Sequence, residues 1–272
     1  MQELTRENYK DNHDYMSYSR FSRFLRCEAA AANNFKEPST VAQLVGGYVD
    51  AYFSDEQEQF KAEHPEIYNS RTGELKKDFI QAETIIERIE SDEVFLQFLD
   101  GEKQAIMTGT IDDVPFKIKM DAYKPHKFIT DLKVMRDFNK VWSDAYRSYV
   151  SFVEGYDYDI ELAIFQEIVY QNTGEKLPCY LACITKEEPS DIGIFQLSQK
   201  QLDEALRIVK SNLPRIRQIL NGELAPHRCE TCNYCRATKK ARVLSTDCIG
   251  LNGDQLRDIG IQCDDRKIKN KE

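Results

Sequence analysis

The sequence predicts a mixed α/β (α+β) protein, in which helices flank a central mixed β-sheet, folded as a single domain over residues 1–272. Three observations predict this class. Apolar residues recur at helical spacing up to residue 100, residues 104–135 switch to the alternation of strands, and helical and strand-like segments then follow each other. The expected parts of the domain are a helical part (15–100), a core (101–222), and a Cys-rich segment with a polar tail (223–272).

Three segments of the helical part predict helices. The first is SYSRFSRFLRCEAAAA (17–32), with Ser17 or Ser19 as the N-cap, because a serine hydroxyl can accept a free backbone N–H at a helix start. Segments 39–53 and 78–99 place apolar residues three and four positions apart. They predict two further amphipathic helices.

The core begins where the periodicity changes. Segments 104–111, 115–123 and 127–135 predict three short strands, joined by turns at 112–113 and 124–127. A helical region is expected next, from about 138 to 154. The remaining elements are expected to be a helix at 158–172 ended by Gly174, strands at 178–185 and 192–198, and a helix at 199–213.

Composition narrows the class of protein. Hydrophobic residues make up 41% and aromatic residues 11% of the chain, as in a globular protein, and the charged fraction of 31% is somewhat above average. The net charge of −9 excludes a general polyanion binder, so any contact with nucleic acid must be local or helped by bound cations. With no membrane-length apolar run and no basic-then-apolar signal region in residues 1–16, we expect a cytoplasmic protein without a membrane partner.

Residues 126–137, HKFITDLKVMRD, carry a carboxylate and an ammonium on a strand otherwise suited to a core. Asp131 and Lys133 are two residues apart, so both should point to the same face. Asp121 and Asp131 are equidistant from His126, so a symmetric hairpin places them opposite each other, with Cβ atoms ~4.5–5.5 Å apart. Two opposed carboxylates are destabilising unless a cation joins them, and the pattern therefore predicts a divalent-metal site.

A simpler interpretation of the hairpin stays open from these residues alone. Lys119 and Lys133 can pair with the two aspartates on a solvated face. The acid-x-Lys pattern is also common by chance, since residues 74–76 and 265–267 repeat it or nearly so.

The wider context resembles a known family. MDAYKPHKFITDLK (120–133) resembles the Asp…Asp-x-Lys signature of the PD-(D/E)XK nuclease superfamily, with Met120 in place of the proline. The order of the pieces over roughly residues 15 to 240 resembles its RecB-like and phage-type (exodeoxyribonuclease VIII-like) exonuclease branch. In that branch a cysteine-bearing helix and a Gly-x-x-His helix come first, and GGYVDAYF matches the latter except that Asp50 replaces histidine. The resemblance implies a restriction-endonuclease-like core.

The same branch carries a Gln-x-x-x-Tyr helix after the Asp-x-Lys strand. In this sequence that motif is either Glu161-x-x-x-Phe165, which is better placed, or the literal match Gln166-x-x-x-Tyr170. The resemblance does not decide which of them has the substrate-positioning role, with Tyr170 toward the DNA in the second case.

The resemblance also implies a division of labour. Asp121 and Asp131 would bind the metal together with the Leu132 carbonyl, and Lys133 would hold the attacking water and stabilise the developing charge. Asp50 would complete a second metal position. A charged oxygen there suits Mg²⁺ or Mn²⁺ better than a histidine nitrogen does.

Basic residues recur every three positions on the first predicted helix. Arg20, Arg23 and Arg26 alternate with Phe21 and Phe24, and this stripe can follow a DNA backbone, as can the basic segment 236–242. A solvated helix face is the alternative for each segment.

A cysteine cluster near the C-terminus is the second candidate site. Cys229, Cys232 and Cys235 are separated by two residues each, as in loops that wrap a metal. Related nucleases with a [4Fe–4S] cluster draw one further cysteine from the N-terminal helix, and Cys27 fits that role, although their last spacing is wider. Zinc with Cys248 or His227 as fourth ligand, and reduced thiols without metal, stay open. Cys179 and Cys183 alternate with apolar residues and are expected in the core.

Two functions follow from these patterns. The first is a metal-dependent DNA exonuclease, which the resemblance places in phage or prophage recombination or repair beside a single-strand annealing partner protein. The second is a non-catalytic DNA-binding or assembly module on the same fold. The presence of Asp121, Asp131 and Lys133 favours the enzyme. Cleavage polarity, strand preference and oligomeric state, a homo-oligomer included, are left open.

Overall fold

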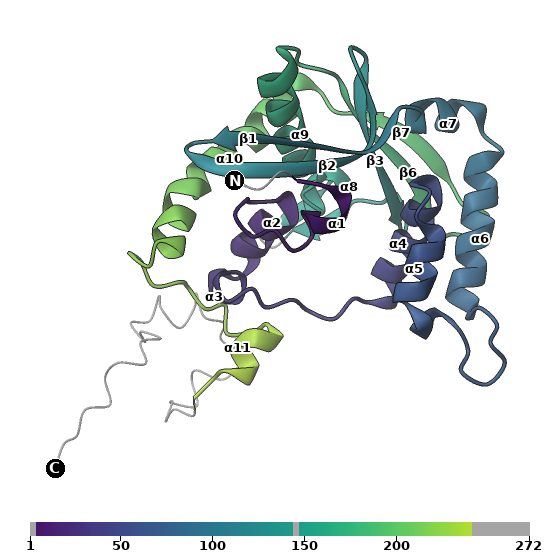
Figure 1. Cartoon of the computed structure of the whole chain (residues 1–272), viewed down its shortest axis with the longest axis horizontal. Helices are drawn as coiled ribbons and strands as arrows, with labels where there is room; N and C mark the ends of the chain where they lie inside the picture. The colour runs from purple at the N-terminus through teal and green to yellow at the C-terminus, as the bar shows by residue number, and fades with distance from the viewer. Residues whose placement is uncertain (1–3, 144–146, 241–272) are drawn as a thin grey trace. The chain divides into compact units, whose positions relative to one another are not determined.

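The computed structural model describes residues 4–143 and 147–240 (Figure 1). They divide into two compact units, each described by itself below. The sheet unit contains residues up to 18 and residues 39–211, and the cysteine unit contains residues 19–38 and those from 212 onward. The expectation of one domain over the chain stays a prediction.

The sheet unit is built on a five-stranded mixed sheet in the order β1-β2-β3-β6-β7. Strands β1 (Glu102–Ile111), β2 (Val114–Lys124) and β3 (Phe128–Met135) form an antiparallel meander. Strand β6 (Cys179–Thr185) pairs parallel with β3, and β7 (Ile192–Gln196) pairs antiparallel with β6. The central mixed sheet and all five strands expected from the sequence are confirmed.

The β1–β2 hairpin turns through two aspartates. Asp112 and Asp113 have φ angles of 45° and 64°, and Ile111 pairs with Val114 directly across the turn. Positive φ at both central residues is the geometry of a two-residue hairpin whose twist matches that of the strands, and aspartate tolerates it. The turn therefore fixes the register of the long β1–β2 ladder.

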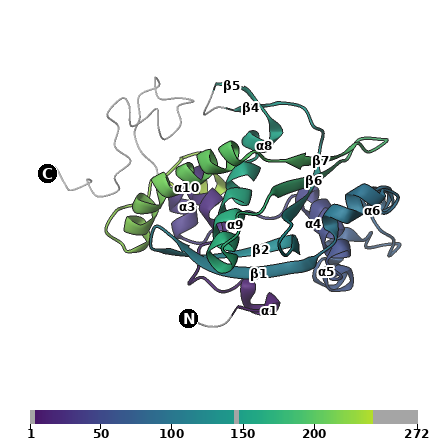
Figure 2. The ribbon, with the colours of Figure 1, turned by 90° about the horizontal axis from the view of Figure 1, so that it is seen from above.

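The parallel pairing of β3 with β6 requires a crossover, and α9 (Tyr158–Thr173) supplies it. This helix packs against β1, β2 and β3, and Figure 2 shows it crossing β1 and β2. Gly174, with φ 76°, ends the helix as expected, because glycine adopts the left-handed conformation without a Cβ penalty.

The other face of β3 packs on the N-terminal helices. Leu132 and Ala182 share a core with α4 (Val41–Phe53), α6 (Lys77–Glu90) and α7 (Glu93–Leu99). Figures 1 and 2 show α4 and α6 together with the short α5 (Gln57–Glu63). Because strand side chains alternate, Asp131 and Lys133 point away from this core, toward α9. Two short helices before α6 are α1 (Arg6–Tyr9) and the 3₁₀ turn η1 (Pro65–Ile67).

Two sequence-based expectations for this unit are wrong. Segment 78–99 is two helices instead of one, because Asp92 caps a new helix by accepting the Phe95 N–H at 2.9 Å. The described part of segment 138–154 contains a two-stranded ribbon, β4 (Val141–Ser143) and β5 (Ser148–Val150), followed by the single turn α8 (Phe152–Gly155). Its β-branched and aromatic residues favour strands over a helix.

The cysteine unit is mainly helical. Helix α2 (Tyr18–Arg26) enters it, α3 (Glu28–Ala32) follows, and α11 (Asn233–Ala237) carries the end of the cysteine cluster. The helix expected over 17–32 is thus divided at Cys27, whose extended backbone (φ −160°, ψ 105°) separates α2 from α3.

Helix α10 (Gln199–Leu220) is longer than the 199–213 expected and contains Pro214. Ile216 and Ile219 are buried beyond the proline, so the apolar face continues past it and outweighs the lost backbone hydrogen bond. Among the described residues, no helix is long and apolar enough to cross a membrane.

Candidate active site

The strands β2 and β3 separate at Asp121. Their ladder pairs Lys124 with Phe128 and ends at Ala122 with Thr130, and the same register would next bring Asp121 opposite Asp131. Instead of a ladder bond, the Leu132 N–H donates to Asp121 Oδ2 at 2.9 Å. The Asp121 carboxylate thus takes the place of a backbone acceptor, at the point where the two strands open.

Asp131 and Lys133 lie on the same face of β3, as the alternation predicts. The Lys133 Nζ lies 2.7 Å from Asp131 Oδ2 and 2.9 Å from Glu161 Oε2 on α9. The exposed fractions of the three side chains are 20%, 5% and 15% for Lys133, Asp131 and Glu161. The solvated-face alternative therefore does not describe this pair, because water is largely excluded from it.

Burial and charge act on these groups together. Burial raises the pKa of Asp131 well above its usual range, and the neighbouring carboxylates of Glu161 and Asp121 add to this against the attraction of Lys133. Burial alone would lower the pKa of Lys133, but Asp131, Glu161 and Asp121 together raise it. One ammonium thus faces three carboxylates, and this surplus of negative charge favours an additional cation.

Gln104 on β1 links the carboxylates of Asp50 and Asp121. Its amide nitrogen donates to Ser54 Oγ at 2.7 Å and lies 3.4 Å from Asp121 Oδ1 and 3.5 Å from Asp50 Oδ1. Gln104 is only 2% exposed and has a φ of 53°, an unfavourable backbone conformation for a non-glycine residue. Its side-chain oxygen is buried and has no hydrogen-bond partner among the described residues.

Asp50 reaches the site from α4. Burial and the charge of Asp121 raise the pKa of Asp50 to about 7, while Lys119 and Lys133 act in the opposite direction. Asp50 and Lys119 also line an open pocket of about 180 Å³ with Lys10 and His64. The side of the site formed by α4 is therefore accessible from solution.

The sequence-based reasoning missed Gln104, although a signal was present. A two-residue turn at Asp112–Asp113 fixes a register in which residue 104 lies opposite residue 121, as the pairs Lys103–Ala122 and Ala105–Met120 show. Both ladders that flank Asp121 are therefore interrupted at this residue.

The donor set fits a hard divalent cation. Three aspartate carboxylates, a buried amide oxygen and the Leu132 carbonyl are the oxygen ligands that Mg²⁺ accepts. Among the described residues, however, only the four cysteines bring three or more ligand atoms within 4.8 Å of one another. Between the aspartates lie the Gln104 amide and the Lys133 ammonium, which compensate the carboxylate charge.

The structure brings Glu161, and not Gln166, to Lys133. Gln166 is buried and exchanges hydrogen bonds with Gln199, and its amide also donates to the Leu177 carbonyl at 2.8 Å. Five positions along a helix turn a side chain by about 140°, so Glu161 and Gln166 point in different directions. Phe165 is in the core, and Tyr170, 43% exposed, follows nine positions after Glu161 on the opposite side of the helix.

The arginine stripe lies on α2, which belongs to the cysteine unit except for its first residue. Burial lowers the pKa of Arg20, with a further contribution from Arg23, and the Arg23 guanidinium donates to the Phe35 carbonyl at 3.2 Å. Arg26 is exposed, whereas Phe21 and Phe24 are buried. A DNA-binding role for this stripe stays a prediction. Of segment 236–242, the last two residues lie outside the described residues, as does Cys248.

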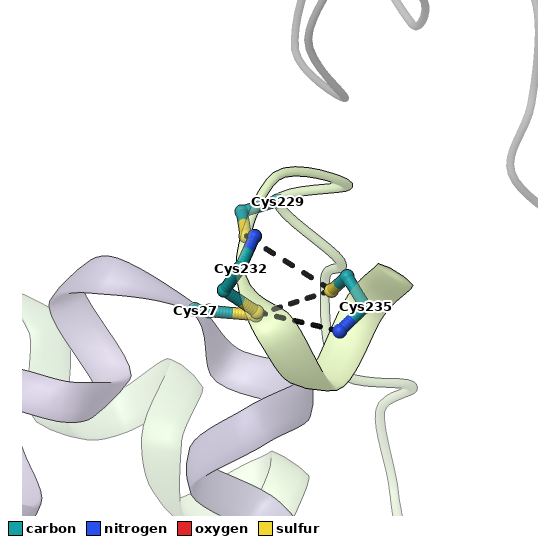
Figure 3. A group of neighbouring side chains, drawn as sticks. All are labelled: Cys27, Cys229, Cys232 and Cys235. Carbon is teal, nitrogen blue, oxygen red and sulfur yellow. Dashed lines mark hydrogen bonds between the residues drawn. The ribbon is translucent and has the colours of Figure 1, made fainter. Parts of the chain in front are cut away.

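The four predicted cysteines converge, as Figure 3 shows. Cys27 Sγ lies 3.6 Å from Cys235 Sγ, and Cys229 Sγ lies 3.9 Å from the same atom. Backbone N–H groups of Cys232 and Cys235 donate to the sulfurs of Cys229 and Cys232 at 3.3 and 3.4 Å. Burial acts to raise the pKa of Cys229, but hydrogen bonds from Thr231 and Cys232 stabilise its thiolate and lower the pKa to about 6.

Glu28 holds the segments of this unit together. Its carboxylate accepts two bonds from the Arg215 guanidinium, at 2.5 and 2.8 Å, and one from the His227 N–H at 2.6 Å. The Ala29 N–H donates in turn to the His227 carbonyl. Cys27 is therefore placed beside the other three cysteines by contacts that do not involve sulfur.

The sulfur positions fit a thiolate-bound metal. Zinc with four sulfurs at about 2.3 Å requires sulfurs about 3.8 Å apart, close to the 3.6 and 3.9 Å found here. A [4Fe–4S] cluster takes the same four-cysteine set but spreads the ligands over four irons, so the sulfurs would have to move apart. Cys179 and Cys183 are buried in β6, as expected for core residues.

Comparison with known proteins agrees with this geometry. Residues 17–238 match the family model described as "PDDEXK-like domain of unknown function (DUF3799)". A crystal structure from Eubacterium rectale, described as a "Putative exonuclease", is 41% identical, with a TM-score of 0.88 over 92% of this chain and 100% of that chain. A structure named SSO0001 reaches a TM-score of only 0.31 at 13% identity, which supports no inference.

No curated protein matches the chain significantly. The family model covers most of the chain, and it confirms the resemblance that the Asp…Asp-x-Lys hairpin predicts. The protein belongs to the PDDEXK-like family DUF3799.

Proposed function

We propose that this protein is a DNA exonuclease that hydrolyses phosphodiester bonds with the help of Mg²⁺ or Mn²⁺. The observation that carries the proposal is the position of Lys133, held between Asp131 and Glu161 in a largely buried site beside Asp121. A non-catalytic binding module has no need for this arrangement. The description of the 41% identical relative as an exonuclease supports the same activity.

Asp121 and Asp131 are the proposed ligands of the cation, together with the Leu132 carbonyl, and Asp50 contributes from α4. The cation, when bound, supplies an activated water and neutralises charge on the phosphate oxygens. When no cation is bound, the Gln104 amide and the Lys133 ammonium reduce the electrostatic repulsion between these carboxylates. These contacts allow the folded protein to hold several carboxylates close together even when no cation is bound.

Lys133 acts on the reacting phosphate. Its ammonium group has three N–H donors, two of which are directed to Asp131 and Glu161, so one is left to bind a phosphate oxygen or the attacking water. A positive donor held in a site that excludes water stabilises the charge that develops in the transition state. Glu161 is a positioning residue, because it fixes the ammonium without itself reaching the substrate.

The four cysteines form the proposed second metal site. A thiolate-bound zinc ion or an iron–sulfur cluster there would join α3 to the segment before α11, within the cysteine unit. A zinc ion held by all four cysteines would be structural, because no position is left for substrate.

The biological setting follows the family resemblance. We place the enzyme in phage or prophage DNA recombination or repair, acting beside a single-strand annealing protein. A homo-oligomer is compatible with this setting.

The test is a time course with end-labelled linear duplex DNA and Mg²⁺ or Mn²⁺, run beside covalently closed circular DNA of the same sequence. The proposal expects the linear DNA to shorten from its ends while the circular DNA stays intact, and EDTA to stop the reaction. Cleavage of both forms at the same rate would show an endonuclease. No cleavage of either with both metals would favour the non-catalytic module.

A further inference from the structure

The β4–β5 ribbon exposes a pair of aromatic side chains. Trp142 is 53% exposed and Tyr149 is 67% exposed, and they lie opposite each other in the ribbon with ring centroids 5.5 Å apart. Both side chains keep more than half of their surface exposed, so each ring still presents aromatic surface to the solvent. Such a pair is suited to bind a ligand with a flat, apolar face.

The ribbon lies in the segment of the chain that connects the two elements of the proposed active site. It follows β3, which carries Asp131 and Lys133, and it precedes α9, which carries Glu161. Val141 packs so closely on Gly155 of α8 that a Cβ at Gly155 would lie 1.9 Å from the Val141 methyl carbon. Figure 2 shows the ribbon next to α8. Its base is therefore fixed to the helical turn that leads into α9.

Aromatic side chains also continue from this turn to the catalytic lysine. Tyr156, 38% exposed, directly follows Gly155, and its ring lies 5.6 Å from the ring of Tyr158. The Tyr158 ring lies in turn 5.1 Å from Lys133 Nζ. Aromatic residues thus lead from the turn on which the ribbon packs to the group that would bind the reacting phosphate.

Positive charge accompanies the aromatic pair. Lys140 and Arg147 are exposed at the two ends of the ribbon, in a protein whose net charge is −9. Phosphates on one side and flat rings on the other are the two features of a single nucleic-acid strand. A duplex hides the faces of its bases within the stack, so it cannot use the rings in the same way.

We propose that Trp142 and Tyr149 form a stacking platform for unpaired bases of the DNA strand whose phosphodiester bond lies at Lys133. This inference rests on the proposed nuclease function and specifies its substrate as a single-stranded segment at the site. Stacking on a ring does not depend on base identity, so the platform gives the enzyme affinity for unpaired DNA of any sequence.

The protein carries its own reporter, because Trp142 is its only tryptophan. The experiment titrates the full chain in EDTA with a single-stranded oligothymidylate, and separately with a blunt duplex of similar length, while tryptophan emission is recorded. Stacking of a base on Trp142 should quench the emission with the single strand and much less with the duplex. Unchanged emission while anisotropy of a labelled oligonucleotide shows binding would overturn the inference.

Variants separate stacking from folding. Tyr149→Ala should weaken binding of the single strand by about 5- to 150-fold, as expected for the loss of one base–aromatic contact, and Tyr149→Phe should keep it. Val94→Ala truncates another apolar side chain that is more than half exposed, on α7, and should change nothing. Equal affinity of Tyr149→Ala and wild type would overturn the platform and leave the ribbon as a surface for a protein partner.

The same samples distinguish this inference from the proposed function. The titrations contain no metal, so they decide the platform whether or not the protein cleaves DNA. Cleavage of linear duplex by wild type with Mg²⁺, together with unquenched Trp142, would overturn the platform alone. Quenched Trp142 without cleavage under any metal would overturn the enzyme and keep the binding surface.

Discussion

Lys133 on β3 lies 2.9 Å from Glu161 on α9, although 27 residues separate the two in sequence. The crossover that makes β3 and β6 parallel also places α9 over the Asp-x-Lys face of β3. The contact between Lys133 and Glu161 therefore follows from the topology of the sheet, and the first prediction concerns this pair.

Glu161→Gln should reduce the rate of DNA cleavage by about 10- to 100-fold, as is typical for residues that orient a reacting group. The substitution keeps the shape of the side chain but removes the charge that fixes the ammonium. Affinity for the divalent cation should change little, because Glu161 is not a proposed ligand. Glu167→Gln neutralises another carboxylate of α9 and serves as the control, with unchanged rate expected. Steady-state cleavage at saturating metal measures both, and an unimpaired Glu161→Gln enzyme would exclude the positioning role.

Gln104→Leu should lower the free energy of unfolding of the metal-free protein by about 1–3 kcal/mol, because the buried carboxylates of Asp50 and Asp121 lose their shared amide donor. Addition of Mg²⁺ should restore part of this loss if a cation can take over the compensation. Gln59→Leu removes an exposed amide–carboxylate bond on α5 and should cost far less. Urea unfolding in EDTA and in Mg²⁺ measures all three proteins. Equal losses for Gln104→Leu and Gln59→Leu would show that Gln104 has no special role.

The pKa of Asp50 predicts a pH dependence of stability. A folded-state pKa of about 7, above the ordinary value, means that the folded protein binds more protons than the unfolded chain between about pH 4 and 7. Stability from this group is thus present at low pH and is lost as the pH rises toward 7. Relative to wild type, Asp50→Asn should gain stability as the pH rises from 5 to 8 in EDTA. A wild-type-to-variant difference that is constant between pH 5 and 8 would contradict the buried position of Asp50.

The cysteine site predicts a bound metal that depends on Cys27. Cys27→Ser should lose the metal and lower the melting temperature, because a four-thiolate site contributes its binding energy to folding. Cys183→Ala, in the core of β6, should keep the metal. Metal analysis with a visible spectrum of anaerobically purified protein identifies the occupant: iron with broad visible absorption, or colourless zinc. Metal-free wild type with a melting temperature equal to that of Cys27→Ser would rule the site out.

The strands and their turns could be predicted because local chemistry decides them. The alternation in 104–135 and the turn residues Asp112, Asp113 and His126 fix both hairpins, so the placement of Asp131 and Lys133 on one face followed directly. The convergence of Cys27 with the three later cysteines was also predicted, from the family resemblance and not from spacing.

Other features depend on contacts that no local pattern records. The spacing of apolar residues around the ribbon suits a helix as well as a strand, so residue type alone favours strands only weakly, and packing of Val141 on Gly155 and of Trp142 on Tyr149 stabilises them. Gln104 could be placed only by combining the turn type at Asp112–Asp113 with the position of Asp121 on the neighbouring strand. Glu161 and Gln166 could not be separated by sequence, because that choice depends on how α9 is rotated over the sheet.

The central claim is that Asp121, Asp131 and Lys133 form one metal-dependent hydrolytic site, and Asp131→Asn compared with Lys133→Ala tests it most directly. Calorimetric titration with Mn²⁺ and cleavage of end-labelled linear duplex are measured on the same preparations. The account predicts that Asp131→Asn loses both Mn²⁺ binding and cleavage, whereas Lys133→Ala still binds Mn²⁺ and cleaves about 10²–10³-fold more slowly. If both variants bind Mn²⁺ and cleave DNA as wild type does, the site is not the catalytic centre.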